Sequence, residues 1–249
     1  MSSPHQITSQ VTHASPWDKN GTTMMESNRG HLLPIYVLAD ESGSMSDNID
    51  DLNDGLRSLH QALLGEPMAA AKVRFSVLGF SDDVVERVRL VDLRSANEFP
   101  RLTTRGMTSY RAAFEDLITR IPSDVGGLKA EGYQVHRPAV FFFSDGLPNR
   151  GEDWQDAHRR LTDRGVTLGA PNIIACGIVD ADAQTINAVA TQPEFGFIVN
   201  KGVDVGAAIA KFCASLTKSV IASGRSLASS SPQLVVDKPE GFTVAIDVI

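Results

Sequence analysis

Continuous apolar runs alternate with helical patterns along this chain, and that alternation constrains the fold more than any other feature. Most of the runs are apolar at successive positions, as in LPIYVLA and NIIACGIV. Such runs are typical of strands that are covered on both faces of a parallel sheet. Six of them predict strands, at residues 33–39, 73–80, 84–91, 138–144, 172–179 and 195–200.

Stripes of apolar residues with helical spacing lie between most of these strands. The clearest stripe runs from Ile49 to Leu63 at intervals of three and four residues. Further stripes predict helices over 110–121, ended by Pro122, over 154–161 and over 205–220. Strands that alternate with helices form right-handed βαβ units. The sequence therefore predicts an α/β fold: a Rossmann-like, doubly wound, mostly parallel six-stranded sheet with helices on both faces.

Two connections depart from this alternation. Only Ser81, Asp82 and Asp83 separate the second and third strands. A parallel crossover needs about a dozen residues, so this pair is expected to form a hairpin. Charges within the run at 84–91 favour an antiparallel strand at the sheet edge. Residues 122–137 contain several glycines and predict a long surface loop.

The folded part is expected to be one domain over residues 31–222. Residues 1–30 are polar and predict a disordered N-terminal arm. Residues 223–249 predict a C-terminal extension with short strand segments, LVVD and FTVAIDVI. We expect this extension to pack on the edge or face of the sheet, or on another copy, because one face of it is apolar. That face carries Phe242, Val244, Ile246 and Val248.

Composition excludes several classes of function. The net charge of −7 and the pI of about 5.3 argue against a nucleic-acid partner. No apolar run approaches the ~18–20 residues of a membrane span, so no membrane partner is expected. Cys176 and Cys213 lie within apolar patterns and are expected to be buried free thiols. Such thiols suit a cytoplasmic protein.

Three polar clusters are predicted to meet at one edge of the sheet, where the carboxyl ends of the central strands bind ligands in α/β folds. In DESGSM (40–45), Asp40, Ser42 and Ser44 occupy alternate positions and can point the same way, while Glu41 and Gly43 face away.

The other two clusters each supply one residue. Thr108 lies in GMTSY, just before a predicted helix, and Asp145 lies in FFFSDGLPN, just past a predicted strand. With Asp40, Ser42 and Ser44 they make an all-oxygen set, which suits Mg²⁺ or Mn²⁺. DxSxS is by itself also ordinary turn chemistry, so the prediction depends on all three clusters.

Together these motifs resemble the von Willebrand factor A (VWA) domain with its metal-ion-dependent adhesion site, over about residues 32–222. The resemblance implies that Ser42, Ser44 and Thr108 bind the metal directly, and that Asp40 and Asp145 bind it directly or through water. It also implies that a protein partner supplies an Asp or Glu as the last ligand.

Within that family, LPIYVLADESGSM and FFFSDGLPN look most like the bacterial TerY-like proteins of tellurium-resistance and related operons. This finer resemblance implies a metal-dependent interaction module in a stress-response or phosphorylation-linked system. Its partner would be a protein phosphatase or kinase from the same operon. The sequence departs from the pattern at Glu41, where a small residue is frequent.

An enzymatic alternative uses the same residues differently. Asp40 could be the nucleophile of a Mg²⁺-dependent phosphatase or phosphotransferase. Such enzymes usually place a second carboxylate two residues later, where this chain has Ser42. No lysine lies between Lys19 and Lys72 to stabilise a transferred phosphate. The sequence therefore favours a binding module over an enzyme.

Overall fold

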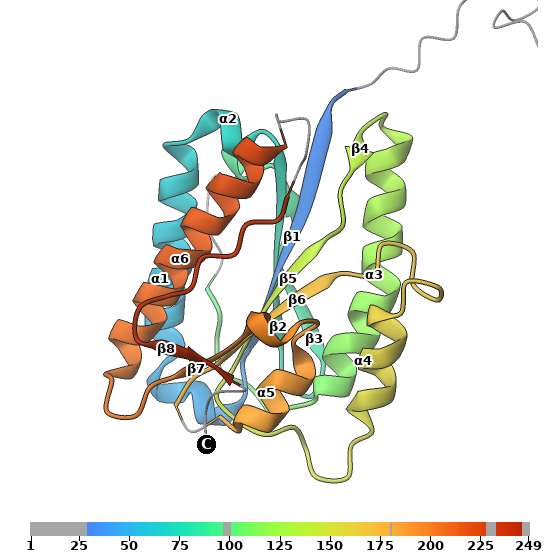
Figure 1. Ribbon diagram of the computed structural model, residues 1–249. Helices are drawn as coiled ribbons and strands as arrows, with labels where there is room; N and C mark the ends of the chain where they lie inside the picture. Colours follow the sequence, from blue (N-terminus) through green and yellow to red (C-terminus); the bar gives the residue numbers. More distant parts are fainter. Residues whose placement is uncertain (1–28, 97–100, 180, 228–232, 246–249) are drawn as a thin grey trace, which may run out of the picture.

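A computed structural model describes residues 29–96, 101–179, 181–227 and 233–245, and a central sheet organises them (Figure 1). The strands of this sheet are β1 (His31–Asp40), β2 (Val73–Phe80), β3 (Val84–Val91), β4 (Gln134–Val135), β5 (Ala139–Ser144), β6 (Asn172–Gly177), β7 (Gly196–Val199) and β8 (Phe242–Val244). Their order is β3-β2-β1-β5-β6-β7-β8, and the short β4 pairs with the start of β1.

The pairing confirms a mostly parallel sheet. β1 is parallel to both β2 and β5, and β5, β6 and β7 continue the parallel arrangement. β2 and β3 form the expected antiparallel hairpin, closed by a hydrogen bond from Ser81 N–H to the Asp83 carbonyl. The three-residue connection leaves no other pairing for these two strands.

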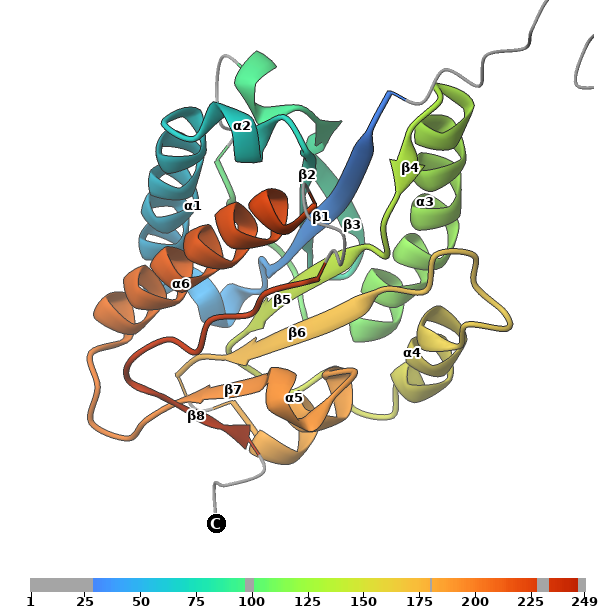
Figure 2. The ribbon, with the colours of Figure 1, turned by 45° about the horizontal axis from the view of Figure 1, so that its top comes forward.

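Helices cover both faces of the sheet (Figure 2). One face carries α1 (Ile49–Leu64), α2 (Pro67–Ala70) and α6 (Val205–Ser226), and the other carries α3 (Tyr110–Ala130), α4 (Trp154–Thr162) and α5 (Ala183–Val189). Short 3-10 turns η1 (Gly43–Asp47), η2 (Leu93–Ser95) and η3 (Pro193–Phe195) complete the connections. In β1, Ile35 and Val37 join one core while Tyr36 and Leu38 join the other, which explains its continuous apolar run.

The number of strands and edges differs from the prediction. In the part of the chain that the structure describes, the sheet has eight strands rather than six, and both of its edge strands are antiparallel rather than one. The second antiparallel edge is β8, which pairs with β7. Phe242 is buried against the α6 side of the core, and this burial favours strand addition at that edge. The expectation that the C-terminal segment packs on the sheet edge is confirmed for residues 242–244, whereas Ile246 and Val248 lie outside the described residues.

The helix predicted to end at Pro122 continues to Ala130, so the expected loop over 122–137 is wrong for most of its length. A proline inside a helix costs about 3 kcal/mol because it removes one hydrogen bond and crowds the preceding turn. Val125 and Leu128, beyond the proline, are 3% and 9% exposed in the core. Burying two such side chains contributes about 1.5–3 kcal/mol each, which offsets the cost of the proline.

The segment after α6 is extended but is not the strand that LVVD predicted. Its backbone bonds to hydroxyls of α6 instead of to another strand. Asp237 N–H donates to Ser219 Oγ at 3.0 Å, and Val235 N–H donates to Ser223 Oγ at 2.9 Å. Ser215 Oγ donates to the Asp237 carbonyl at 2.6 Å. These three serines recur every fourth residue, so they lie on one face of the helix.

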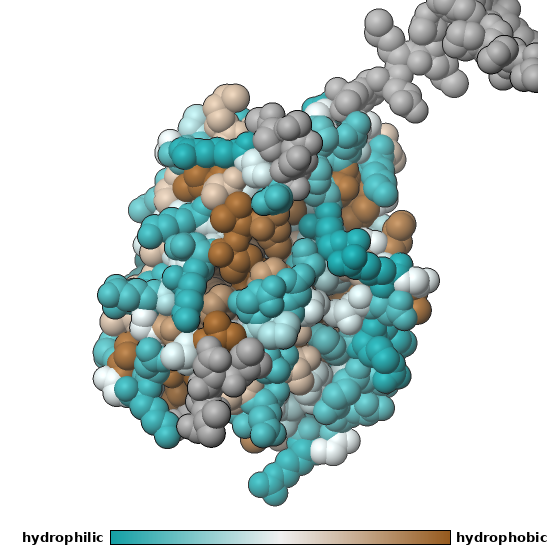
Figure 3. Space-filling model, in the orientation of Figure 1, coloured by the Kyte–Doolittle hydropathy of each residue, from teal (hydrophilic) through white to brown (hydrophobic). Residues whose placement is uncertain are grey.

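Two further predictions concern the cysteines and membrane spans. Cys176 and Cys213 are both buried and free, as predicted. Of the described helices, α6 alone is long and apolar enough to cross a membrane. However, it packs against α1 and contributes Ile209, Phe212 and Leu216 to the core. Figure 3 shows a mainly hydrophilic surface with a hydrophobic area where Figure 1 draws α6 and the segment after it.

Candidate metal centre

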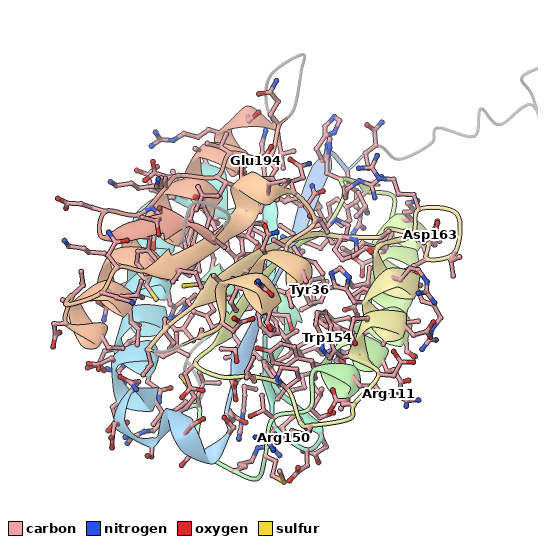
Figure 4. All side chains as sticks on the ribbon, turned by 60° about the horizontal axis from the view of Figure 1, so that its bottom comes forward. Tyr36, Arg111, Arg150, Trp154, Asp163 and Glu194 are labelled. Atoms are coloured by element: carbon pink, nitrogen blue, oxygen red, sulfur yellow. The ribbon has the colours of Figure 1, made fainter. Side chains whose placement is uncertain are left out.

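The predicted site residues lie at the carboxyl ends of β1 and β5, which are neighbours in the sheet. Asp40 is the last residue of β1, and Ser42 and Ser44 follow in the turn into η1. Asp145 follows β5, and Thr108 lies two residues before α3. Figure 4 turns this end of the molecule toward the viewer and labels Arg150, in the loop after β5.

Asp40 is completely buried and accepts two hydrogen bonds. Ser42 N–H donates to Asp40 Oδ1 at 2.8 Å, which closes the turn on itself. Ser144 Oγ donates to Asp40 Oδ2 at 2.6 Å. Tyr110 OH in turn donates to Ser144 Oγ at 2.9 Å. The carboxylate is therefore fixed in orientation by groups from β5 and α3.

Hydroxyl and carboxylate oxygens of the other residues are in direct contact. The Oγ atoms of Ser42 and Ser44 lie 3.0 Å apart. Ser44 Oγ donates to Asp145 Oδ1 at 2.9 Å. Hydrogen bonds therefore join Ser42 to Ser44 and Ser44 to Asp145, and the backbone of Ser42 to Asp40.

Thr108 is brought to the same place by its backbone. Its N–H donates to Asn149 Oδ1 at 3.2 Å, and its carbonyl accepts from Asn149 N–H at 2.9 Å. Gly43 N–H donates to the carbonyl of Gly106 at 3.2 Å, which ties the two loops together. Thr108, Ser42 and Ser44 line one open cavity of about 690 Å³. The structure thus brings Ser42, Ser44 and Thr108 to one cavity, and hydrogen bonds join Asp40 and Asp145 to the two serines.

The donor set fits Mg²⁺ or Mn²⁺. Hydroxyl and carboxylate oxygens are ligands that these hard cations prefer. The hydrogen bonds that link Ser42, Ser44 and Asp145 bring three such oxygens close enough together to contact one ion. Within the described residues, no three His, Cys, Asp or Glu side chains gather to hold a metal, so the site depends on its hydroxyls.

The electrostatics of the two carboxylates also favour a cation. Burial raises the pKa of Asp40 to about 6, because the charged form loses its hydration. Hydrogen bonds from Ser144 and Ser42 oppose this effect, while the charge of Asp145 adds to it. Burial likewise raises the pKa of Asp145. A divalent cation between these groups would stabilise both ionised forms.

Ser144 and Asn149 are positioning residues that the sequence reasoning missed. Ser144 holds the second oxygen of Asp40, and Asn149 holds both backbone groups of Thr108. Each lies within FFFSDGLPN, the motif that supplied Asp145. The sequence signals for these two residues were a hydroxyl directly before Asp145 and an amide in the loop after it.

Glu41 faces away from the site, as predicted, but it does not reach solvent. Its side chain is completely buried and forms ion pairs with two arginines. Arg87 donates to both carboxylate oxygens at 2.9 Å, and Arg105 Nε donates to Oε2 at 2.9 Å. Thr103 N–H adds a bond to Oε1 at 3.0 Å. This cluster joins the end of β1 to β3 and to the loop that carries Thr108.

The rim of the cavity combines apolar and charged side chains. Met107 and Leu147 are 64% and 61% exposed and line the cavity beside Thr108. Arg150 lines it as well, and it has no ion pair among the residues that the structure describes. Arg150 therefore adds a positive charge to the rim.

The environment of Asp40 argues against the enzymatic alternative. A nucleophilic carboxylate needs an oxygen that the substrate can approach. Asp40 is 0% exposed, and both of its oxygens accept hydrogen bonds from the protein. The exposed hydroxyl of Ser44 faces the cavity instead.

The chain belongs to the von Willebrand factor type A domain family, whose model matches residues 35–207. Domains of this family are typically interaction modules rather than enzymes. None of the curated proteins matches the sequence.

Solved structures share the fold at low sequence identity. Proximal thread matrix protein 1 from the mussel byssus is 19% identical, with a TM-score of 0.54 over 81% of this chain and 49% of that one. Another structure of it, with a zinc-occupied MIDAS motif, has 18% identity, a TM-score of 0.55 and the same coverage. The pilus adhesin SpaC from Lactobacillus rhamnosus GG is 14% identical, with a TM-score of 0.61 over 78% of this chain and 30% of that one. The chain thus spans about half of the mussel protein and under a third of the adhesin.

Proposed function

We propose that this protein is a metal-dependent protein–protein interaction module. Ser42, Ser44 and Thr108 would hold Mg²⁺ or Mn²⁺ directly, with Asp40 and Asp145 binding directly or through water. A carboxylate from the partner would complete the coordination shell. The observation that carries the proposal is the direct contact of hydroxyl and carboxylate oxygens from Ser42, Ser44 and Asp145 at the carboxyl ends of β1 and β5.

The charge of the site supports an acidic partner residue. If Asp40 and Asp145 bind mainly through water, the three neutral hydroxyls leave a divalent ion under-neutralised, and an anionic ligand is then favoured over water at the open position. Charge-assisted ligation of this kind contributes several kcal/mol, whereas an exposed salt bridge contributes about 1 kcal/mol or less. Binding should therefore depend on the metal more than on charges of the rim.

The side chains around the cavity indicate which partner residues would fit it. Met107 and Leu147 present exposed apolar surface beside the hydroxyl ligands, and Arg150 offers a guanidinium that forms no ion pair with the described residues. A matching segment would carry an Asp or Glu flanked by an apolar residue, with a second acidic group for Arg150.

The finer biological setting follows from the sequence resemblance. We place the module in a bacterial stress-response or tellurium-resistance-type, phosphorylation-linked system, with a protein phosphatase or kinase of the same operon as partner. The support is the likeness of LPIYVLADESGSM and FFFSDGLPN to TerY-like proteins. Two buried free thiols support a cytoplasmic location.

The test is a binding measurement with a partner that co-purifies in Mg²⁺ and is lost in EDTA. Its affinity should collapse in chelator, in Asp145→Ala, and when the contacting carboxylate of the partner becomes an amide. Asp50→Asn, an exposed acidic change on α1, is the matched control and should bind normally. Equal affinity with and without Mg²⁺ would show that recognition lies elsewhere on the domain.

A further inference from the structure

A second cavity lies at the opposite end of the sheet, by the amino ends of its parallel strands. It is lined by Leu33 of β1, by Asn172 at the start of β6, and by His136 and Arg137 just before β5. Arg164, in the loop after α4, forms another wall. Because the metal centre is at the carboxyl ends of the same strands, the two sites are separate.

Positive charge gathers in this cavity without a matching negative charge. Arg137 and Arg164 line it, and neither forms an ion pair among the residues that the structure describes. Burial lowers the pKa of Arg137, and the charge of Arg164 lowers it further. Burial and the neighbouring His31 lower the pKa of His136. Both shifts have the direction that an uncompensated positive cluster produces.

The carboxylates nearest in sequence do not line the cavity. Asp163 and Glu194, labelled in Figure 4, are the acidic residues closest in sequence to the lining, and neither lines the cavity. Asp163 instead accepts a hydrogen bond from Gly165 N–H at 2.7 Å. Among the described residues, neither arginine has a carboxylate partner, although the chain carries a net charge of −7.

Neutral groups in the lining could complete an anion site. Asn172, Gln192 and Gln233 bring side-chain amides, which can donate hydrogen bonds without adding charge. Arg137 is already held in place, since its Nη1 donates to the carbonyl of Ala170. A guanidinium fixed in this way loses less freedom when it binds an oxyanion, and its planar donors suit phosphate.

The size of the cavity limits the ligand. Its volume of about 240 Å³ equals that of about eight water molecules in the liquid. Pockets for drug-sized ligands usually span about 300–1,000 Å³. The cavity therefore suits a phosphate group with at most a small substituent.

We propose that this cavity binds a small phosphate-bearing anion, held by Arg137 and Arg164 with the amides of Asn172 and Gln192 as neutral donors. The site is independent of the proposed metal function, because it shares no residue with the metal centre.

The test is calorimetric titration of metal-free protein with inorganic phosphate and, separately, with O-phosphoserine. EDTA is present so that phosphate cannot bind through a metal, and the ionic strength is fixed with NaCl. We expect saturable one-to-one binding of at least one of the two probes. Tighter binding of O-phosphoserine would identify a phosphomonoester as the ligand, and tighter binding of phosphate would identify the free ion.

Arg164→Gln should weaken that binding at least about tenfold, or about 1.4 kcal/mol. Arg164 is exposed, so its substitution should leave the fold intact. Arg137→Gln should weaken phosphate binding as well, but Arg137 is partly buried and its loss could disturb the fold, so Arg164→Gln is the deciding variant. Arg57→Gln, which changes an exposed arginine on α1 outside both cavities, is the control and should bind phosphate normally. Absence of saturation by both probes up to about 10 mM, or equal binding in wild type and Arg164→Gln, would overturn the proposal.

Discussion

The buried carboxylate of Glu41 allows a quantitative test of how the metal loop is held. Glu41 is 0% exposed, and it accepts three charge-assisted hydrogen bonds from Arg87 and Arg105 and one from Thr103 N–H. The perturbation is Glu41→Gln, which keeps the shape of the side chain and removes its charge. Arg87 then loses its ion-pair partner next to the protein interior, whereas Arg105 keeps its pair with Asp83.

The size of the effect follows from the burial of the cluster. Removing one partner of a buried ion pair costs about 3–5 kcal/mol, because the remaining charge is left uncompensated. The side chains of Arg87 and Arg105 are 19% and 25% exposed, so water can partly hydrate them. We therefore expect the lower end, about 3 kcal/mol. For a chain of this length, that loss lowers Tm by about 6–12 °C.

The assay is thermal and urea unfolding of Glu41→Gln beside Asp50→Asn. Asp50 pairs with Arg101 at the surface, where the two side chains are 71% and 66% exposed, so the control should lose about 1 kcal/mol or less. Mg²⁺ affinity should also fall in Glu41→Gln alone, because Arg105 anchors the loop that carries Thr108. Equal losses of stability in the two variants would refute the reasoning.

Three further predictions concern the site and the C-terminal segment. Ser42→Ala combined with Ser44→Ala should stay folded but lose Mg²⁺ and Mn²⁺ binding by calorimetry, since two direct oxygens disappear; unchanged affinity would rule out the assignment. Because the folded pKa of Asp40, about 6, lies above its usual 3.8, the folded state holds this proton more tightly. Stability from this group is therefore greatest below about pH 4, and about 3 kcal/mol is lost as the pH rises through 6 without metal. Unfolding in EDTA and in Mg²⁺ at pH 5 and pH 8 should show larger stabilisation by Mg²⁺ at pH 8, and Asp40→Asn should remove that difference. Ser219→Ala should cost about 1–3 kcal/mol and speed amide exchange at Asp237, whose N–H loses its partner; unchanged exchange would contradict the role of the serine.

Features with a local cause could be predicted from the sequence. The run in β1 is apolar at successive positions because Ile35 and Tyr36 enter different cores. The stripe from Ile49 to Leu63 became α1, since its spacing matches one face of a helix. The site residues were found because Asp40 and Asp145 both follow central strands.

Features that depend on residues far away in the sequence could not be predicted from the sequence. α3 passes Pro122 because Val125 and Leu128 are buried by elements far away in the sequence. The alternating pattern predicted a strand at 242–244, but its antiparallel pairing with β7 depends on a distant neighbour that no local pattern identifies. The alternation of side-chain directions in residues 40–44 predicted that Glu41 faces away from the site. It could not predict the arginines that neutralise its charge, because Arg87 and Arg105 lie 46 and 64 residues away.

The central claim is that one divalent cation binds where the ends of β1 and β5 meet the loop before α3. The most direct measurement is a crystal structure of the protein grown with Mn²⁺, with data collected for anomalous scattering. The account predicts one strong anomalous peak about 2.1 Å from the Oγ atoms of Ser42 and Ser44, with the Thr108 hydroxyl also in contact. No peak at this position, or a peak bound to other residues, would contradict it.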